Sequence, residues 1–179
     1  INMSDVVSGG PINMIKSFYR WQNTGSYVSY NTVTNVAQSP SYTRYVPLGQ
    51  AFFVRQSVIG SDQLDFTNNC RITDPDFSLM PSFNKTSLKL FRLELTGTNG
   101  LDYHSVVLFH DQATVGFDND YDAYYIPSGG AIIPEFSTFN GTNDSLQFSI
   151  NGLPTSSLNN VTVPLNIEIK VAGTYTIDL

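Results

Sequence analysis

The 179-residue sequence contains nine basic and fifteen acidic residues, and charged and aromatic residues each make up 13% of it. A net charge of -6 without a Lys/Arg cluster argues against a nucleic-acid partner, because phosphate backbones are bound by clustered cations. No apolar run reaches the roughly eighteen residues that a membrane helix needs, so we expect no membrane insertion. Low charge, with polarity supplied mostly by Ser, Thr and Asn, favours an extracellular or cell-surface protein.

Strand-like segments separated by Gly- and Asn-containing turns recur along the chain, and a short helical turn is indicated only within residues 5–15. Residues 74–84 are predicted to form a long surface connection. This pattern predicts one all-β domain over residues 1–179, an antiparallel β-sandwich of jelly-roll type. The predicted strands are residues 14–21, 27–30, 50–56, 64–67, 88–95, 105–109, 123–126, 145–150, 161–169 and 173–179.

Two further features bear on how the chain folds. Residues 46–54 contain the nearly continuous apolar run Ala51, Phe52 and Phe53, which predicts a strand buried on both faces. The single Cys70 excludes an internal disulfide, and its place in an alternating pattern favours a small buried side chain over a reactive thiol. The chain begins with Ile1 and shows no signal peptide, so we expect it to be a fragment of a larger secreted protein.

Three carboxylates on alternate residues, Asp118, Asp120 and Asp122, form an acidic turn between two predicted strands. Such oxygen ligands can converge on calcium if the loop curls back on itself. Two other interpretations stay open at this point. The carboxylates can face solvent or accept hydrogen bonds from backbone N–H groups in a tight connection, and Arg71 can pair with Asp118 or Asp122 and fix the loop without a metal.

Exposed aromatic side chains next to amides and carboxylates are typical of sugar-binding sites on β-sandwiches. Tyr19, Trp21 and Tyr27 are the candidate ligand-binding residues, and Tyr19 and Trp21 share one face of a regular strand. Tyr30 points to the face opposite Tyr27 and cannot extend the same surface. The alternative is that Trp21 fills the core, because large aromatic side chains are usually buried.

Catalytic signatures are weak throughout the sequence, and we expect the chain not to be an enzyme. His104 and His110 flank an apolar strand without a Cys nearby, which favours satisfied strand-end histidines over metal ligands. Nucleophile motifs and phosphate-binding loops are missing from the sequence. A glycosidase needs two placed carboxylates, for which the nominal candidates are Glu94, Asp111, Glu135 and Glu168.

Several motifs occur in an order that resembles the β-rich domains of Bacteroidota cell-surface and secreted proteins exported by the type IX secretion system, in the region before their C-terminal sorting domain. The motifs are FYRW at 18–21, VPLGQAFFV at 46–54, FTNNCR at 66–71, LEL at 93–95, ATVGFDNDYDAY at 113–124 and VPL at 163–165.

The resemblance implies display on the cell surface or release from it, without implying a catalytic residue set. It also implies partnership with neighbouring domains of the parent protein and with glycans or other surface proteins. The sorting domain that follows in such proteins is not in this sequence, which agrees with a fragment. We therefore expect a non-catalytic extracellular surface module with a structural, adhesion or display role, and a carbohydrate-binding module as the alternative.

Overall fold

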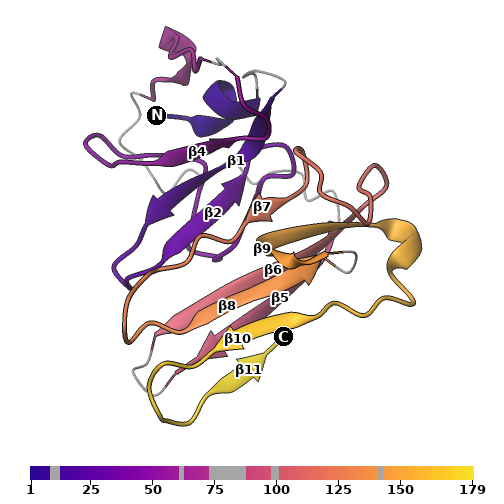
Figure 1. Ribbon diagram of the computed structural model, residues 1–179. Helices are drawn as coiled ribbons and strands as arrows, with labels where there is room; N and C mark the ends of the chain where they lie inside the picture. Colours follow the sequence, from indigo (N-terminus) through magenta and orange to yellow (C-terminus); the bar gives the residue numbers. More distant parts are fainter. Residues whose placement is uncertain (9–12, 61–62, 73–87, 98–100, 141–142) are drawn as a thin grey trace.

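The computed structural model describes residues 1–8, 13–60, 63–72, 88–97, 101–140 and 143–179, which form two packed β-sheets (Figure 1). No helix among these residues is long and apolar enough to cross a membrane. The predicted all-β, sandwich-like fold is confirmed. The predicted connection at residues 74–84 lies outside the described residues.

The first sheet has four strands in the order β3-β2-β1-β4. Strands β1 and β2 form an antiparallel hairpin whose turn contains Gly25 with a φ of +84°, a conformation that favours glycine. Strand β4 pairs with the other side of β1 and forms one edge of the sheet. The bounds are β1 Met14–Trp21, β2 Tyr27–Asn31, β3 Val36–Ala37 and β4 Phe53–Gln56.

The second sheet has seven strands, with the order β10-β8-β9-β6-β5-β11 and with β7 paired to β9. All its pairs are antiparallel except β6 and β9, whose parallel register aligns Val106 with Ile150. This pair departs from the purely antiparallel sandwich that the sequence predicted. The bounds are β5 Lys89–Thr96, β6 Asp102–His110, β7 Ala123–Tyr124, β8 Glu135–Asn140, β9 Asn143–Pro154, β10 Leu165–Glu168 and β11 Thr176–Asp178.

Strand β1 contributes to two separate cores. Phe18 packs with Met14, Tyr30 and the helical turn η1 (Ser4–Ser8) on one side of the first sheet. The next residue, Tyr19, points to the other side and packs between the sheets with Val106, Leu108 and Ile150. Because successive side chains of a strand alternate between its faces, β1 is buried on both faces along most of its length.

Several predicted elements differ from the structure. Residues 64–67 are not a strand, and strands β3 and β8 were not predicted. The prediction that residues 46–54 form a doubly buried strand is wrong, because β4 begins only at Phe53 and is an edge strand with that residue exposed. Cys70 is buried at the end of the 3₁₀ turn η2 (Asn68–Cys70), as predicted.

Candidate ligand-binding site

Three aromatic side chains, Trp21, Tyr27 and Phe53, form a cluster at one end of the first sheet, which we call the aromatic rim. The Tyr27 ring lies 5.0 Å from the ring of Trp21 and 5.5 Å from that of Phe53, nearly perpendicular to both. Trp21 is 46% exposed and Phe53 is 50% exposed, while Tyr27 is half-buried between them. The rim therefore presents a corrugated apolar surface to solvent.

Strand register explains why these three rings meet. Trp21 on β1 lies opposite Tyr27 on β2, and Tyr19, two residues earlier on β1, lies opposite Phe53 on β4. Directly opposed residues share a face, so all four side chains point to the side of the second sheet. Tyr19 is covered by the second sheet, whereas the rim residues lie beyond this cover.

Among the predicted ligand-binding residues, Tyr19 requires a correction. Its side chain is only 1% exposed and belongs to the core between the sheets, so it cannot touch a ligand at the surface. The alternative that Trp21 fills the core is also wrong, because nearly half of its surface faces solvent. Phe53 is a rim residue that the sequence analysis assigned to the core.

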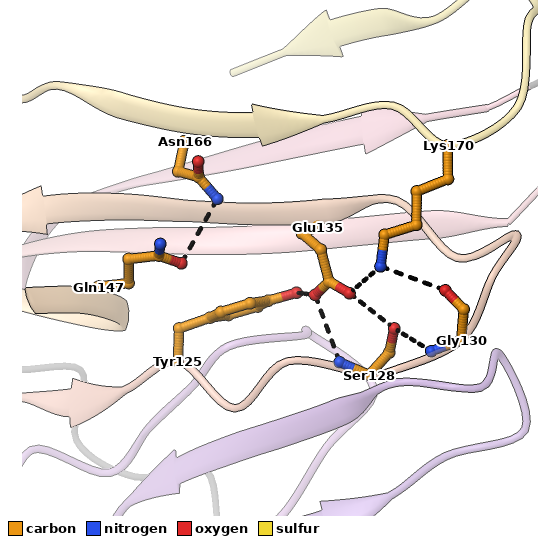
Figure 2. Close-up of polar contacts among 7 residues, drawn as sticks. All are labelled: Tyr125, Ser128, Gly130, Glu135, Gln147, Asn166 and Lys170. Atoms are coloured by element: carbon orange, nitrogen blue, oxygen red, sulfur yellow. Dashed lines mark hydrogen bonds and ion pairs between the residues drawn. The ribbon is translucent and has the colours of Figure 1, made fainter. Parts of the chain in front are cut away.

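A polar network lies beside the rim, centred on the buried carboxylate of Glu135 at the start of β8 (Figure 2). Lys170 pairs with Glu135 Oε1 at 2.5 Å, and Ser128 donates to the same oxygen from its hydroxyl at 2.8 Å. The other oxygen, Oε2, accepts from the Tyr125 hydroxyl and from the Ser128 backbone N–H. Tyr125 of the network and Tyr27 of the rim line one narrow cavity between the sheets.

The hydrogen bonds set the charge state of Glu135. Burial raises the pKa of a carboxyl group, but the donors Lys170, Tyr125 and Ser128 favour the ionised form and hold the pKa of Glu135 below its ordinary value. Burial and the same carboxylate raise the pKa of the Tyr125 hydroxyl. Glu135 is therefore ionised, and both of its oxygens are bound by protein donors. Its contacts connect the loop at Ser128 to the segment at Lys170.

An open depression of about 310 Å³ lies beside Arg55 of β4. Arg55 stands two residues after Phe53 and therefore on the same face of β4, and its guanidinium lies 3.9 Å from the centroid of the Tyr124 ring. Tyr124 is itself stacked with Phe117 at 4.6 Å. The depression is lined by Arg55, Tyr124, Tyr125, Pro127, Leu146 and Gln147.

A family model matches residues 11–179, a range that includes the residues of both the rim and the depression. The chain belongs to the family described as Domain of unknown function (DUF8693). No curated protein and no solved structure matches the chain.

The acidic loop of this DUF8693 chain binds its own backbone. Asp122 is buried, and its two carboxylate oxygens accept from the backbone N–H groups of Gly152 at 2.6 Å and Asp118 at 2.7 Å. Asp118 in turn accepts from the backbone N–H of Thr114 at 2.6 Å. Asp120 is exposed. Of the interpretations left open by the sequence, the structure confirms that Asp118 and Asp122 hold backbone N–H groups in a tight connection.

The structure shows neither of the other two arrangements considered for the acidic loop, the calcium site and the ion pair with Arg71. Within the described ranges no three His, Cys, Asp or Glu side chains are placed to hold a metal ion, so Asp118, Asp120 and Asp122 do not converge as a calcium site. Arg71 is exposed and makes no ion pair with either aspartate. Calcium binding by the chain stays a prediction from the sequence alone.

The other residues considered for catalysis or metal binding are two histidines and three acids, and most of them contact neighbouring side chains. His104 pairs with Glu94 at 3.3 Å, and burial lowers the pKa of its imidazole. His110 stacks on Tyr121, with 4.4 Å between ring centroids. Asp111 accepts a hydrogen bond from Thr155, and Glu168 is exposed on β10.

Proposed function

We propose that this DUF8693 chain is a non-catalytic extracellular surface module that adheres to carbohydrate through the aromatic rim. The observation that carries the proposal is the exposure of Trp21 and Phe53 on either side of Tyr27. Exposed rings provide apolar faces on which a sugar ring can stack, and aromatic side chains lose little conformational entropy on binding because they have only two side-chain torsions.

The polar surroundings support recognition of a hydroxyl-rich ligand. Gln22 and Ser26 lie in the turn next to Trp21 and Tyr27, and they line the narrow cavity that Tyr27 shares with Tyr125. Gln147 contributes an amide to the wall of the open depression that Arg55 also lines. Such amide and hydroxyl groups are the hydrogen-bonding partners that orient a small polar ligand over an apolar surface.

Two further observations support a non-catalytic role outside the cell. Glu135 is the most buried of the four nominal catalytic carboxylates, and its oxygens are coordinated by a lysine, a tyrosine and a serine rather than left open to a substrate. The low charge and the sequence resemblance to exported surface domains favour an extracellular location. Neighbouring domains of a parent protein and other surface proteins are the further partners that this role implies.

Trp21 makes the proposal testable by fluorescence, because it is the single tryptophan of the chain. We expect glycans selected on an array to shift or quench its emission, and Trp21→Ala to abolish binding while changing the unfolding free energy only slightly. The matched control is Phe91→Ala, since Phe91 is 45% exposed and also packs edge-to-face on a ring, that of Phe109, but lies on the second sheet.

Two outcomes would contradict the proposal. The first is the absence of any glycan binding by the folded wild-type chain. The second is binding that Trp21→Ala and Phe91→Ala weaken to the same extent, because this would place the ligand away from the rim.

A further inference from the structure

Unlike Arg20, Arg44 and Arg92, Arg55 has no hydrogen-bond acceptor among the described residues. Arg20 donates to the Tyr45 carbonyl, Arg92 to the carbonyls of Ala37 and Gln38, and Arg44 to the Tyr45 hydroxyl. Arg55 is exposed, and it makes neither an ion pair nor a hydrogen bond with any described residue. Its guanidinium lies over the ring of Tyr124.

That contact fixes how the guanidinium is presented. The guanidinium carbon lies over the Tyr124 ring, 3.9 Å from its centroid, and the guanidinium N–H groups donate to no described residue. Tyr124 is held in place by near-parallel stacking with Phe117 and Phe148, so the support for Arg55 is rigid. A guanidinium held in this way loses little conformational freedom when an anion binds to its edge.

Among the described side chains, no carboxylate forms an ion pair with Arg55. The buried acid of the adjoining loop, Asp122, has both oxygens bound by backbone N–H groups. A protein with a net charge of -6 thus presents a cation that is unpaired among the described residues, two positions along β4 from Phe53 of the rim. This charge is complementary to an anionic ligand, and the fork of N–H donors matches the two oxygens of a carboxylate.

We infer that the rim and the depression bind acidic carbohydrate, with a sugar ring against Trp21 or Phe53 and the carboxylate of a uronic acid bound by Arg55. Phe53 and Arg55 are two residues apart on β4, a rise of roughly 6–7 Å, which is close to the size of one sugar residue. The inference rests on the proposed function and adds the class of glycan to it. Gln147 lines the same depression, where its amide oxygen accepts hydrogen bonds from Ser137 and Asn166.

The test uses pairs of oligosaccharides that differ only in charge. Oligogalacturonate, oligomannuronate and a glucuronate-containing oligosaccharide are each compared with their carboxyl-reduced, neutral counterparts by calorimetry on the whole chain. We expect at least one acidic member to bind about tenfold or more tightly than its neutral counterpart, because one hydrogen-bonded charge pair has an effect of this size. Raising the salt concentration should weaken only the acidic member.

Variants then assign the effect to the guanidinium. Arg55→Gln should reduce acidic binding about tenfold and leave neutral binding unchanged, and Arg55→Lys should recover only part of it because lysine lacks the fork. Arg71→Gln is the control for loss of one exposed positive charge. Equal binding of acidic and neutral members, or insensitivity to Arg55→Gln while Trp21→Ala still abolishes binding, overturns the inference alone. Failure of every acidic member to bind, while the array finds a neutral glycan that binds, also overturns the inference alone. Absence of binding to any glycan overturns the proposed function with it.

Discussion

Asp122 shows how a single residue determines the geometry of the acidic loop. One carboxylate joins Asp118, four residues earlier in the chain, to Gly152 on β9, thirty residues later. Burial raises the pKa of Asp122 to about 7, and the two backbone donors only partly oppose this shift. The side chain thus connects the loop to the second sheet, although burial makes the ionised form of its carboxyl group unfavourable.

The first prediction at this scale concerns pH. The folded state retains the Asp122 proton up to a higher pH than the unfolded state, so this residue makes the fold less stable as the pH rises from about 4 to about 7. The slope contributed by one such group approaches about 1.4 kcal/mol per pH unit. Urea denaturation at several pH values should show a flatter dependence in Asp122→Asn than in the wild type.

Asp120→Asn is the matched control for this experiment, because Asp120 is exposed in the same loop. It should leave the pH dependence of stability unchanged. Identical pH dependence in the wild type and Asp122→Asn would show that Asp122 titrates at an ordinary pKa in the folded protein.

At the scale of elements, alternation predicted those strands whose two faces differ in polarity or whose apolar content is high. Strand β1 was predicted with its observed bounds, Met14–Trp21. Strand β8 was missed because its buried positions include the polar residues Ser137 and Thr138, which hide the period of two. Strand β3 has only two residues and carries no pattern at all.

The candidate site was only partly predictable, for a related reason. The sequence nominated Trp21 and Tyr27, but hydrophobicity alone cannot tell whether an apolar strand lies in the middle of a sheet or at its edge. Phe53 was therefore assigned to the core, although β4 is an edge strand. One signal was available, since Arg55 follows Phe53 by two residues on the same face of β4 and arginine side chains are mostly exposed.

Close packing of the acidic loop on β9 gives a prediction for a single element. A Cβ atom added at Gly152 would lie 2.6 Å from Tyr121 Cβ and 3.1 Å from its carbonyl oxygen, so the loop would have to move. Gly152→Ala should therefore lower the free energy of unfolding by about 1–3 kcal/mol, measured by chemical denaturation. Gly60→Ala is the control because its added Cβ meets no atom within 4 Å; equal stability of the two variants would contradict this packing.

For the whole molecule, the division into two cores predicts an order of local stability. The amides of β1 should exchange with solvent most slowly in native-state hydrogen exchange, because breaking this strand disrupts both the Phe18 and the Tyr19 cores. The amides of β11 should exchange early, since this short edge strand is exposed at all three residues. Uniform protection across both sheets, or earlier exchange in β1 than in β11, would contradict this order.

The position of Trp21 at the last residue of β1 has a mechanical consequence. A polymer held at the aromatic rim would pull on the end of the strand that is anchored in both cores, and a β-strand under tension transmits load along its backbone to its hydrogen-bonded neighbours. Force from an attached surface would enter the molecule through β1 and divide between its neighbours β2 and β4. The load would therefore act on the strand of the first sheet that is packed into both cores.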